Sequence, residues 1–225
     1  MESADQALWS QVDRYFDDLL IPAEDKLDAA LRANEQAGLP AIDVTGLQGK
    51  FLEFLVRISG ARRILEIGTL GGYSTIWLAR ALPEGGRVVT LELDPHHAEV
   101  ARANLNNAGV LDRVDLIVGP ALDTLQSLEN TASAPFDFIF IDADKESYPQ
   151  YLQWALKLSH VGTIIVADNV VREGKVVQAG CDDPMVQGVL RFTELLAAEP
   201  RLSATVLQTV GTKGYDGFAL AVVLR

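Results

Sequence analysis

Cysteine and histidine are scarce in this sequence. Its single cysteine, Cys181, cannot form an internal disulfide, and only three histidines are present. No Cys/His array with the spacing of a structural zinc site can be found, so a disulfide-stapled or zinc-stabilised domain is excluded. A lone thiol fits a reducing compartment, and we expect a cytoplasmic protein.

Positive charge and long apolar runs are also lacking. The chain has 19 Lys and Arg against 31 Asp and Glu, a net charge of −12, which repels a phosphate backbone and argues against a nucleic-acid partner. No apolar run approaches the roughly 18 residues of a membrane span. Acidic residues interrupt the apolar runs of the first 20 residues, which predicts neither a signal peptide nor a membrane partner.

What is present suits one globular domain. The 225 residues are 48% hydrophobic and contain no internal repeat or Pro/Ser-rich linker, so we expect a single domain over 1–225. Residues 1–60 have helical spacing and form an addition to a sheet core over 61–225. Within that addition Thr45 and Gln48 predict a helix-starting capping box. Apolar residues on one predicted helical face then follow: Leu47, Phe51, Leu55 and Ile58.

From residue 62 onward the pattern changes to short apolar runs rich in β-branched and aromatic residues. Helical segments separate these runs. Asp94 followed by Pro95 marks one helix start, and Ser147 with Gln150 predicts a capping box at another. Alternating strands and helices predict a doubly wound α/β fold, a parallel sheet with helices on both faces. The predicted strands lie at 62–68, 87–93, 113–119, 136–142 and 162–168.

The last quarter of the chain departs from this alternation. Asp183 and Pro184 begin an amphipathic helix that reaches about Ala198. Two strand-like runs, 203–210 and 217–225, follow with a glycine-rich turn between them. We therefore expect a C-terminal antiparallel hairpin on the sheet.

A glycine-rich turn follows the first predicted strand. Gly68, Gly71 and Gly72 permit a tight turn and a close approach of ligand to backbone. Glu92 ends the next strand, 24 residues after Gly68, near the spacing at which an acidic side chain binds ribose hydroxyls. The G-x-G-x-x-G spacing for a pyrophosphate is absent. This combination predicts an adenosine-bearing cofactor without a pyrophosphate.

Polar side chains also end the fourth and fifth predicted strands. Asp142, Asp144 and Lys145 follow one, and Asp168 and Asn169 follow the other. Carboxylate and amide oxygens suit a hard divalent cation, Mg²⁺ or alternatively Ca²⁺ or Mn²⁺. A lysine beside a cation loses its proton more easily and can act as a general base. The competing interpretation is that these residues only cap helices.

Taken together, these segments resemble the cation-dependent S-adenosylmethionine O-methyltransferases, the family that includes catechol and caffeoyl-CoA O-methyltransferases. The resemblance covers most of the chain. It implies a Rossmann-like methyltransferase fold with a mostly parallel seven-stranded sheet. The segments that carry it are LEIGTLGGYS (65–74), FDFIFIDADKESY (136–148), VADNV (166–170) and DGFALAVVLR (216–225).

The resemblance also implies roles for individual residues. Lys145 would be the catalytic base, and Asp142, Asp168 and Asn169 would bind the divalent cation. The acceptor would be a small aromatic diol, the protein a homodimer, and the N-terminal helices a cover for the active site. S-adenosylmethionine would be bound by Val44, Glu66, Gly68, Thr69, Ser74, Glu92, Ala121, Asp142 and Asp144.

The acceptor loop departs from the family pattern. Arg172 stands where several relatives carry an aromatic residue, and Glu173 where plant enzymes carry an amide. Tyr148 and Trp154 are candidates for contact with the acceptor ring, although helical spacing equally predicts core packing for Tyr148. The net negative charge disfavours a coenzyme A tail, so we expect a small catechol, with a hydroxycinnamoyl thioester as the alternative acceptor.

Two other functions fit parts of the pattern. A nicotinamide-dependent oxidoreductase would share the strand, the glycine-rich turn and the acidic residue. It would not explain the candidate metal ligands Asp142, Asp168 and Asn169. A protein that only senses S-adenosylmethionine would have no use for Lys145 beside a cation.

Overall fold

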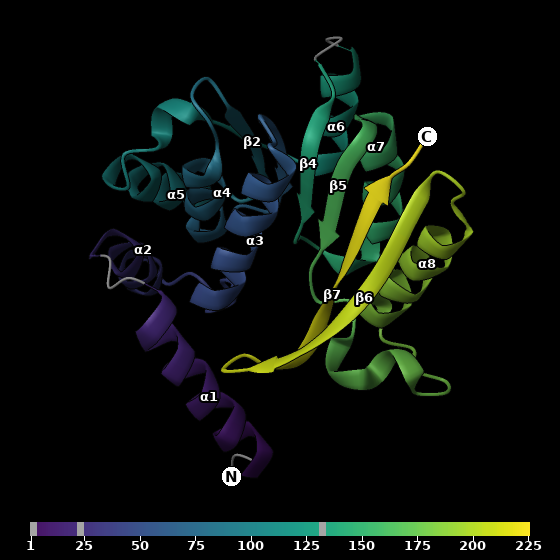
Figure 1. Cartoon of the computed structure of the whole chain (residues 1–225), viewed down its shortest axis with the longest axis horizontal. Helices are drawn as coiled ribbons and strands as arrows, with labels where there is room; N and C mark the ends of the chain where they lie inside the picture. The colour runs from purple at the N-terminus through teal and green to yellow at the C-terminus, as the bar shows by residue number, and fades with distance from the viewer. Residues whose placement is uncertain (1–3, 22–24, 131–133) are drawn as a thin grey trace.

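A seven-stranded mixed sheet forms the centre of the protein, seen in a computed structural model that describes residues 4–21, 25–130 and 134–225. The strand order is β3-β2-β1-β4-β5-β7-β6 (Figure 1), which confirms the expected fold. The strands are β1 (Arg63–Ile67), β2 (Arg87–Glu92), β3 (Val114–Val118), β4 (Phe136–Ile141), β5 (Ser159–Ala167), β6 (Leu202–Gly211) and β7 (Gly214–Val223).

Strands β1 to β5 pair in parallel, and β7 pairs antiparallel with both β5 and β6. Burial explains the apolar runs, since Ile64 to Ile67 are all buried between helical layers. The C-terminal hairpin is confirmed, but β6 and β7 extend further than the sequence suggested and leave only Thr212 and Lys213 between them. Strand β6 is an edge of the sheet, with residues 203–208 exposed.

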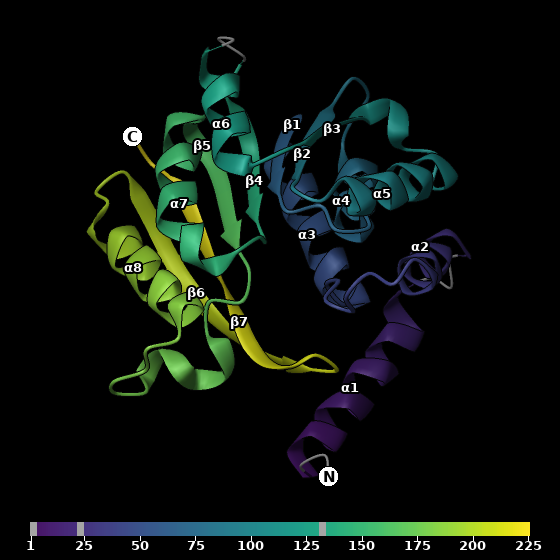
Figure 2. The same ribbon diagram turned by 180° about the vertical axis from the view of Figure 1, so that it is seen from behind.

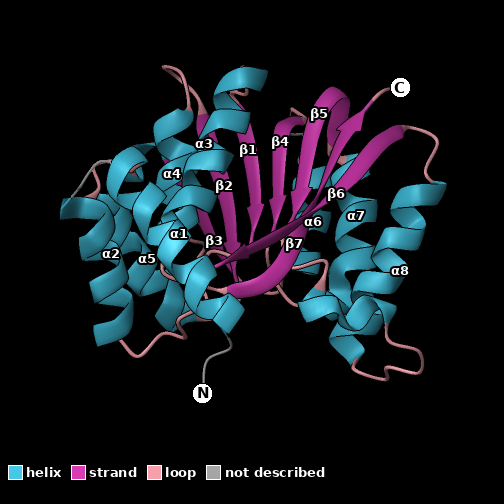
Figure 3. Ribbon diagram, turned by 60° about the horizontal axis from the view of Figure 1, so that its bottom comes forward, coloured by secondary structure: helices cyan, strands magenta, loops and turns pink. Residues whose placement is uncertain are grey.

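Helices cover both faces of the sheet, as the views from behind and from below show (Figure 2, Figure 3). One face carries α3, α4 and α5, and the other carries α6, α7 and α8. No helix within the described ranges is both long and apolar enough to cross a bilayer. The helices are α1 (Ala4–Leu20), α2 (Asp25–Gln36), α3 (Gly46–Ser59), α4 (Tyr73–Ala81), α5 (Pro95–Asn107), α6 (Ala121–Asn130), α7 (Tyr148–Lys157) and α8 (Pro184–Ala198).

The N-terminal addition consists of α1, α2 and α3. Helix α2 packs against α4 and α5, whereas α1 contacts α3 and β6 and extends away from the sheet (Figure 1). The tip of the β6–β7 hairpin is tied to α1, because Asp13 Oδ2 accepts the Thr212 N–H at 2.7 Å and Gln6 Nε2 donates to the Gly211 carbonyl at 2.8 Å. The N-terminal helix and the C-terminal hairpin are thereby joined beside the sheet.

The start of α3 follows the sequence, but its buried face does not. Thr45 Oγ1 accepts the Gln48 N–H at 3.1 Å, and Gln48 Oε1 accepts the Thr45 N–H at 2.8 Å, which confirms the capping box. The predicted apolar face is wrong at Ile58, which is 82% exposed. Leu52 and Val56 are buried instead. The helix is apolar on more than one side, and the face that contacts α4 is the one that is buried.

Candidate active site

The carboxyl ends of β2, β1, β4 and β5 lie side by side. Backbone hydrogen bonds continue beyond the strands, from Gly68 N–H to the Leu91 carbonyl at 3.0 Å and from Asp142 N–H to the Ile67 carbonyl at 2.9 Å. Asp168 N–H donates to the Ile141 carbonyl at 3.0 Å. The predicted residues at these strand ends therefore meet at one edge of the sheet, where parallel α/β proteins bind ligands.

Two glycines of the turn after β1 are required by close packing. Gly68 has φ +101°, and a Cβ there would lie 2.0 Å from the Asp142 carbonyl oxygen. A Cβ on Gly71 would lie 1.9 Å from Asn34 Oδ1. The first glycine thus lets β1 and β4 end side by side, and the second admits a polar side chain from α2. Neither glycine needs a ligand to explain it.

Glu92 fastens this turn to the end of β2. Its Oε2 accepts the N–H groups of Thr69 at 3.2 Å and Leu70 at 2.7 Å, and its Oε1 accepts the Asp94 N–H at 3.0 Å. A carboxylate has about four lone-pair positions, so three bonds leave Oε1 able to accept one more. The side chain is 9% exposed. The sequence predicted Glu92 as a cofactor-binding residue, which stays a prediction, and this internal role was missed.

Glu66 is fully buried beneath the turn and accepts three hydroxyl groups. Ser74 and Thr75 donate at 2.6 and 2.5 Å, and Thr90 donates at 2.7 Å. Burial raises the pKa of Glu66 to about 7, although the three hydroxyl groups act in the opposite direction. Ser74 is only half-buried, so the pair reaches from the interior toward the site. Predicted cofactor contacts at both positions stay predictions.

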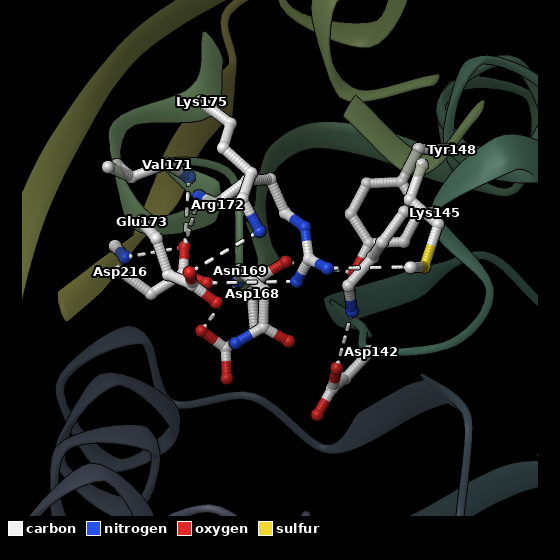
Figure 4. Close-up of polar contacts among 12 residues, drawn as sticks. Asp142, Lys145, Tyr148, Asp168, Asn169, Val171, Arg172, Glu173, Lys175 and Asp216 are labelled. Carbon is white, nitrogen blue, oxygen red and sulfur yellow. Dashed lines mark hydrogen bonds and ion pairs between the residues drawn. The ribbon is translucent and has the colours of Figure 1, made fainter. Parts of the chain in front are cut away.

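Lys145 is held in a buried position by two oxygen partners. Its Nζ donates to Asp142 Oδ1 at 2.8 Å and to the Tyr148 hydroxyl at 2.7 Å, and its side chain is 8% exposed (Figure 4). The Tyr148 hydroxyl lies within hydrogen-bonding distance of two backbone carbonyls, Ile141 at 3.1 Å and Asp168 at 2.9 Å. Burial raises the pKa of Tyr148 well above its ordinary value, so this hydroxyl keeps its proton.

Tyr148 does not lie where it could contact the ring of an acceptor, as the sequence had suggested. Its ring is fully buried against Tyr151 and Phe192, so the core interpretation is the correct one. Trp154 is half-buried on α7, with Lys157 Nζ 4.1 Å from its ring centroid. The link from Tyr148 to Lys145 was missed, and their spacing of three residues was the available signal.

The predicted capping box of Ser147 and Gln150 is wrong, because the Asp144 side chain accepts the Ser147 N–H instead. Asp144 Oδ2 accepts the Ser147 N–H at 3.2 Å, and Asp144 Oδ1 accepts the Tyr151 hydroxyl at 2.5 Å. Ser147 makes no capping bond with its own side chain. Two predicted cofactor contacts lie elsewhere around the site: Val44 is buried just before α3, and Ala121 begins α6.

Asp168 and Asn169 follow β5 beside Asp142. Burial, and then the negative charge of Asp142, raise the pKa of Asp168 to about 7, while Lys145 opposes the shift. Among the described residues the Asp168 side chain accepts only the Asn169 N–H, at 2.8 Å, and Asn169 has a left-handed backbone with φ +55°. Within the described ranges no three Asp, Glu, His or Cys side chains form a metal-binding group. The candidate cation set thus depends on the amide oxygen of Asn169.

Asp216 holds the loop that follows Asn169. Its Oδ1 accepts the N–H groups of Val171 and Arg172, both at 2.9 Å (Figure 4). The loop then has three consecutive positive φ angles, 54° at Arg172, 58° at Glu173 and 79° at Gly174. Asp216 was not identified from the sequence, because it lies in the C-terminal hairpin, 48 residues beyond Asp168.

A sequence profile of the O-methyltransferase family matches residues 23–222. The chain belongs to this family. A catechol O-methyltransferase from Niastella koreensis is 52% identical over 216 residues, 96% of this chain and 98% of its own length. The crystal structure of the Bacillus cereus O-methyltransferase in complex with SAH has a TM-score of 0.95 and 61% identity, covering 96% of this chain and 99% of that one.

Membership in the O-methyltransferase family confirms the resemblance and the enzyme class expected from the sequence. A relative named caffeoyl-CoA O-methyltransferase 1, from Eucalyptus globulus, is 36% identical over 168 residues and covers 71% of this chain. Similarity is thus higher, and extends over more of the chain, for the relative named for catechol.

Proposed function

We propose that this O-methyltransferase transfers the methyl group of S-adenosylmethionine to one hydroxyl of a small aromatic vicinal diol, with the help of a divalent cation. The observation that carries this proposal is the cluster at the ends of β4 and β5. There the buried Lys145 lies against Asp142, and burial, together with the negative charge of Asp142, raises the pKa of Asp168. A base beside paired carboxylates suits the deprotonation of a cation-bound phenol.

The cofactor site in this proposal is the turn between β1 and α4. Glu92 Oε1 accepts the Asp94 N–H and has His97 Nδ1 3.5 Å away, and it keeps room to accept a ribose hydroxyl, while the bonds of Oε2 hold the turn rigid. Backbone of Gly68 and Thr69 borders the same space, and the half-buried Ser74 would face the methionine portion. The cofactor supplies the electrophilic methyl group. The relative from Bacillus cereus was solved with SAH, the demethylated product of that cofactor.

The residues fit a hard cation. Burial and the charge of Asp142 raise the pKa of the Asp168 carboxyl. Its ionised form therefore has too little positive charge nearby to balance it, and a bound cation would supply that charge. Asp142, Asp168 and Asn169 would hold the cation through carboxylate and amide oxygens, the ligand types preferred by Mg²⁺. Bound there, the cation would favour the phenolate form of the diol and orient it.

Protein groups have separate tasks in the reaction. Lys145 Nζ takes the proton of the attacking hydroxyl, and Asp142 and the Tyr148 hydroxyl hold that nitrogen in place. Burial of Lys145 excludes most water from the proton transfer. The turn fastened by Glu92 fixes the direction from which the methyl group is presented. Catalysis then depends chiefly on positioning of the two reactants.

We further propose that the protein is a cytoplasmic homodimer. Helix α1 presents a stripe of apolar side chains that is unusual for a monomer's surface. Its exposed members lie at helical spacing: Leu8, Val12, Tyr15, Phe16, Leu19 and Leu20. A second copy of α1 would bury this stripe. The lone cysteine is consistent with a reducing cytoplasm.

Methyl transfer from labelled S-adenosylmethionine tests the function. The acceptors are catechol, caffeic acid, caffeoyl-CoA and a monophenol, each with Mg²⁺ and with a chelator. We expect labelled product from the free diols only, and only with the cation present. Efficient transfer to caffeoyl-CoA in preference to free diols would favour the thioester alternative. Transfer that is undiminished by the chelator would refute the cation's role.

Asp168→Asn and Asp142→Asn are the informative variants, with Asp182→Asn on an exposed loop as control. Both site variants should lose cation-dependent turnover while remaining folded, and the control should retain it. Wild-type turnover in either site variant would refute the proposed ligand set.

A further inference from the structure

Arg172 is a charged residue of the acceptor loop that the proposed reaction does not use. Its backbone N–H is fixed by Asp216, and its φ of 54° is unusual for a side chain of this size. Unfavourable backbone conformations of this kind are concentrated at functional sites. In Figure 4 the Arg172 side chain lies between the Asp168–Asn169 pair and the Lys145–Tyr148 pair. The loop therefore directs a guanidinium group toward the candidate site.

The guanidinium group has poor internal partners. Its Nε is buried without a hydrogen-bond partner among the described residues. Its Nη2 contacts Met185 Sδ at 4.0 Å, and its Nη1 lies 3.8 Å from Asp216 Oδ2, which is too long for a hydrogen bond. A buried donor without a partner costs about 1–3 kcal/mol. This geometry leaves Arg172 ready to bind an external acceptor of hydrogen bonds.

Neighbouring charges do not neutralise Arg172 fully. Glu173, the next residue, pairs with Lys175 at 3.3 Å. Asp216 Oδ1 accepts three backbone N–H groups, and the contact of its Oδ2 with Arg172 is long, at 3.8 Å. The Arg172 side chain remains 21% exposed, so a ligand can reach it. A bound anion would supply the missing charge and would accept hydrogen bonds from the accessible part of the guanidinium group.

We propose that Arg172 binds a carboxylate group carried by the acceptor, so that the preferred acceptor is an acidic aromatic vicinal diol. This inference rests on the proposed function and narrows its substrate class. A guanidinium fork matches the two oxygens of a carboxylate. One arginine suits a single negative charge, and the net charge of −12 opposes a polyanionic group.

Paired acceptors test the inference. We would measure kcat/KM for 3,4-dihydroxybenzoate and 3-(3,4-dihydroxyphenyl)propanoate, each beside its neutral methyl ester, to sample two distances from ring to carboxylate. The proteins are wild type, Arg172→Met, Arg172→Lys and, as a control on the exposed face of α8, Arg191→Met. Hydrogen bonds to charged groups predict a loss of about 10- to 100-fold for at least one acid in Arg172→Met.

The esters should change by less than about threefold, and Arg172→Lys should be intermediate, since it keeps the charge and loses the fork. Equal losses for acid and ester would overturn the inference, because Arg172 would then act on the site as a whole. Unchanged values for both acids would also overturn it.

A binding measurement separates this inference from the proposed function. Calorimetric titration of each acid and ester into protein saturated with S-adenosylhomocysteine needs no turnover. Stronger binding of an acid than of its ester, lost in Arg172→Met, supports the carboxylate site even if no methyl transfer occurs. Equal binding of acid and ester to the wild type refutes the inference, whereas turnover of the neutral esters sustains the proposed function independently.

Discussion

At the scale of single residues, the site combines buried acidic groups with hydroxyl and ammonium partners. Glu66 is the clearest case, because its carboxyl lies in the interior and accepts hydrogen bonds from three hydroxyl groups. The pKa of Glu66 is about 7 in the folded protein and about 4.5 in the unfolded chain. Between these two pH values the folded protein binds a proton that the unfolded chain has released. This difference makes stability depend on pH.

We expect Glu66 to lower the stability of the apo protein as pH rises from about 4.5 to about 7. Below this window both states are protonated, and above it both are ionised, so the cost reaches a plateau. The shift corresponds to a cost of at most about 3.5 kcal/mol. Urea denaturation between pH 5 and 8 should show a smaller decline in Glu66→Gln than in wild type. Parallel pH curves for the two proteins would contradict the shift.

Lys145 is the second residue whose role can be isolated. Lys145→Met keeps the length of the side chain but removes the donor to Asp142 and Tyr148. We expect kcat to fall by about 10²- to 10⁴-fold, the range of general acid–base effects, with affinity for S-adenosylhomocysteine within about threefold of wild type. Steady-state kinetics and calorimetry measure the two quantities. The control is Lys157→Met, a partly exposed lysine on α7. A parallel loss of cofactor affinity would instead make Lys145 a binding or structural group.

At the scale of elements, the position of Lys145 depends on α8. Gly188 packs so closely that a Cβ there would lie 2.1 Å from the Lys145 carbonyl oxygen and 2.8 Å from Glu146 Cα. Both contacts are with backbone, which cannot move aside as a flexible side chain can. Helix α8 therefore packs directly against the backbone of the short 3₁₀ turn over Lys145–Ser147.

Gly188→Ala should displace that turn or destabilise the fold. Overpacking in a well-packed interior typically costs about 1–3 kcal/mol, offset in part by the better helix propensity of alanine. We expect a lower midpoint in urea and a lower kcat in the protein that remains folded. Glu194→Ala, on the exposed side of the same helix, is the control. Wild-type stability and kcat in Gly188→Ala would show that α8 does not hold Lys145.

Elements also show how far the sequence could lead. Strand runs, the Thr45–Gln48 cap and the Asp94–Pro95 start were predictable, because each depends on residues close together in the chain. The buried face of α3 was not, since it is decided by contact with α4. The cap at Ser147 failed because Asp144, three residues earlier, competes for the same N–H.

The candidate site was predictable to a similar degree. Asp142, Lys145, Asp168 and Asn169 follow strands that the sequence shows, and parallel strands bring their ends together. Asp216 was not predictable, because its bonds to the acceptor loop depend on the antiparallel return of β7 beside β5. Nor did the sequence show that the Glu92 carboxylate accepts three backbone N–H groups from neighbouring turns.

At the scale of the whole molecule, net charge and exposed apolar surface oppose each other. A charge of −12 drives copies apart at low ionic strength. The apolar stripe on α1 favours association, and helix α1 extends away from the sheet where a second copy has access to it (Figure 1). Single exposed apolar residues are common, but six exposed ones at the spacing of one helical face are not.

Tyr15→Glu combined with Leu19→Glu should therefore convert the proposed homodimer to a monomer. These side chains are 61% and 62% exposed, so their replacement leaves the monomer core intact, and it adds charge inside the interface. Sedimentation velocity measures the change, with Val161→Glu as a control of equal exposure, 63%, on the sheet. The wild-type dimer should strengthen from 20 to 300 mM salt, because screening weakens the repulsion between copies while the apolar contact persists. A wild type that sediments as a monomer at every salt concentration would refute the dimer, and a dimer that survives both glutamates would move the interface away from α1.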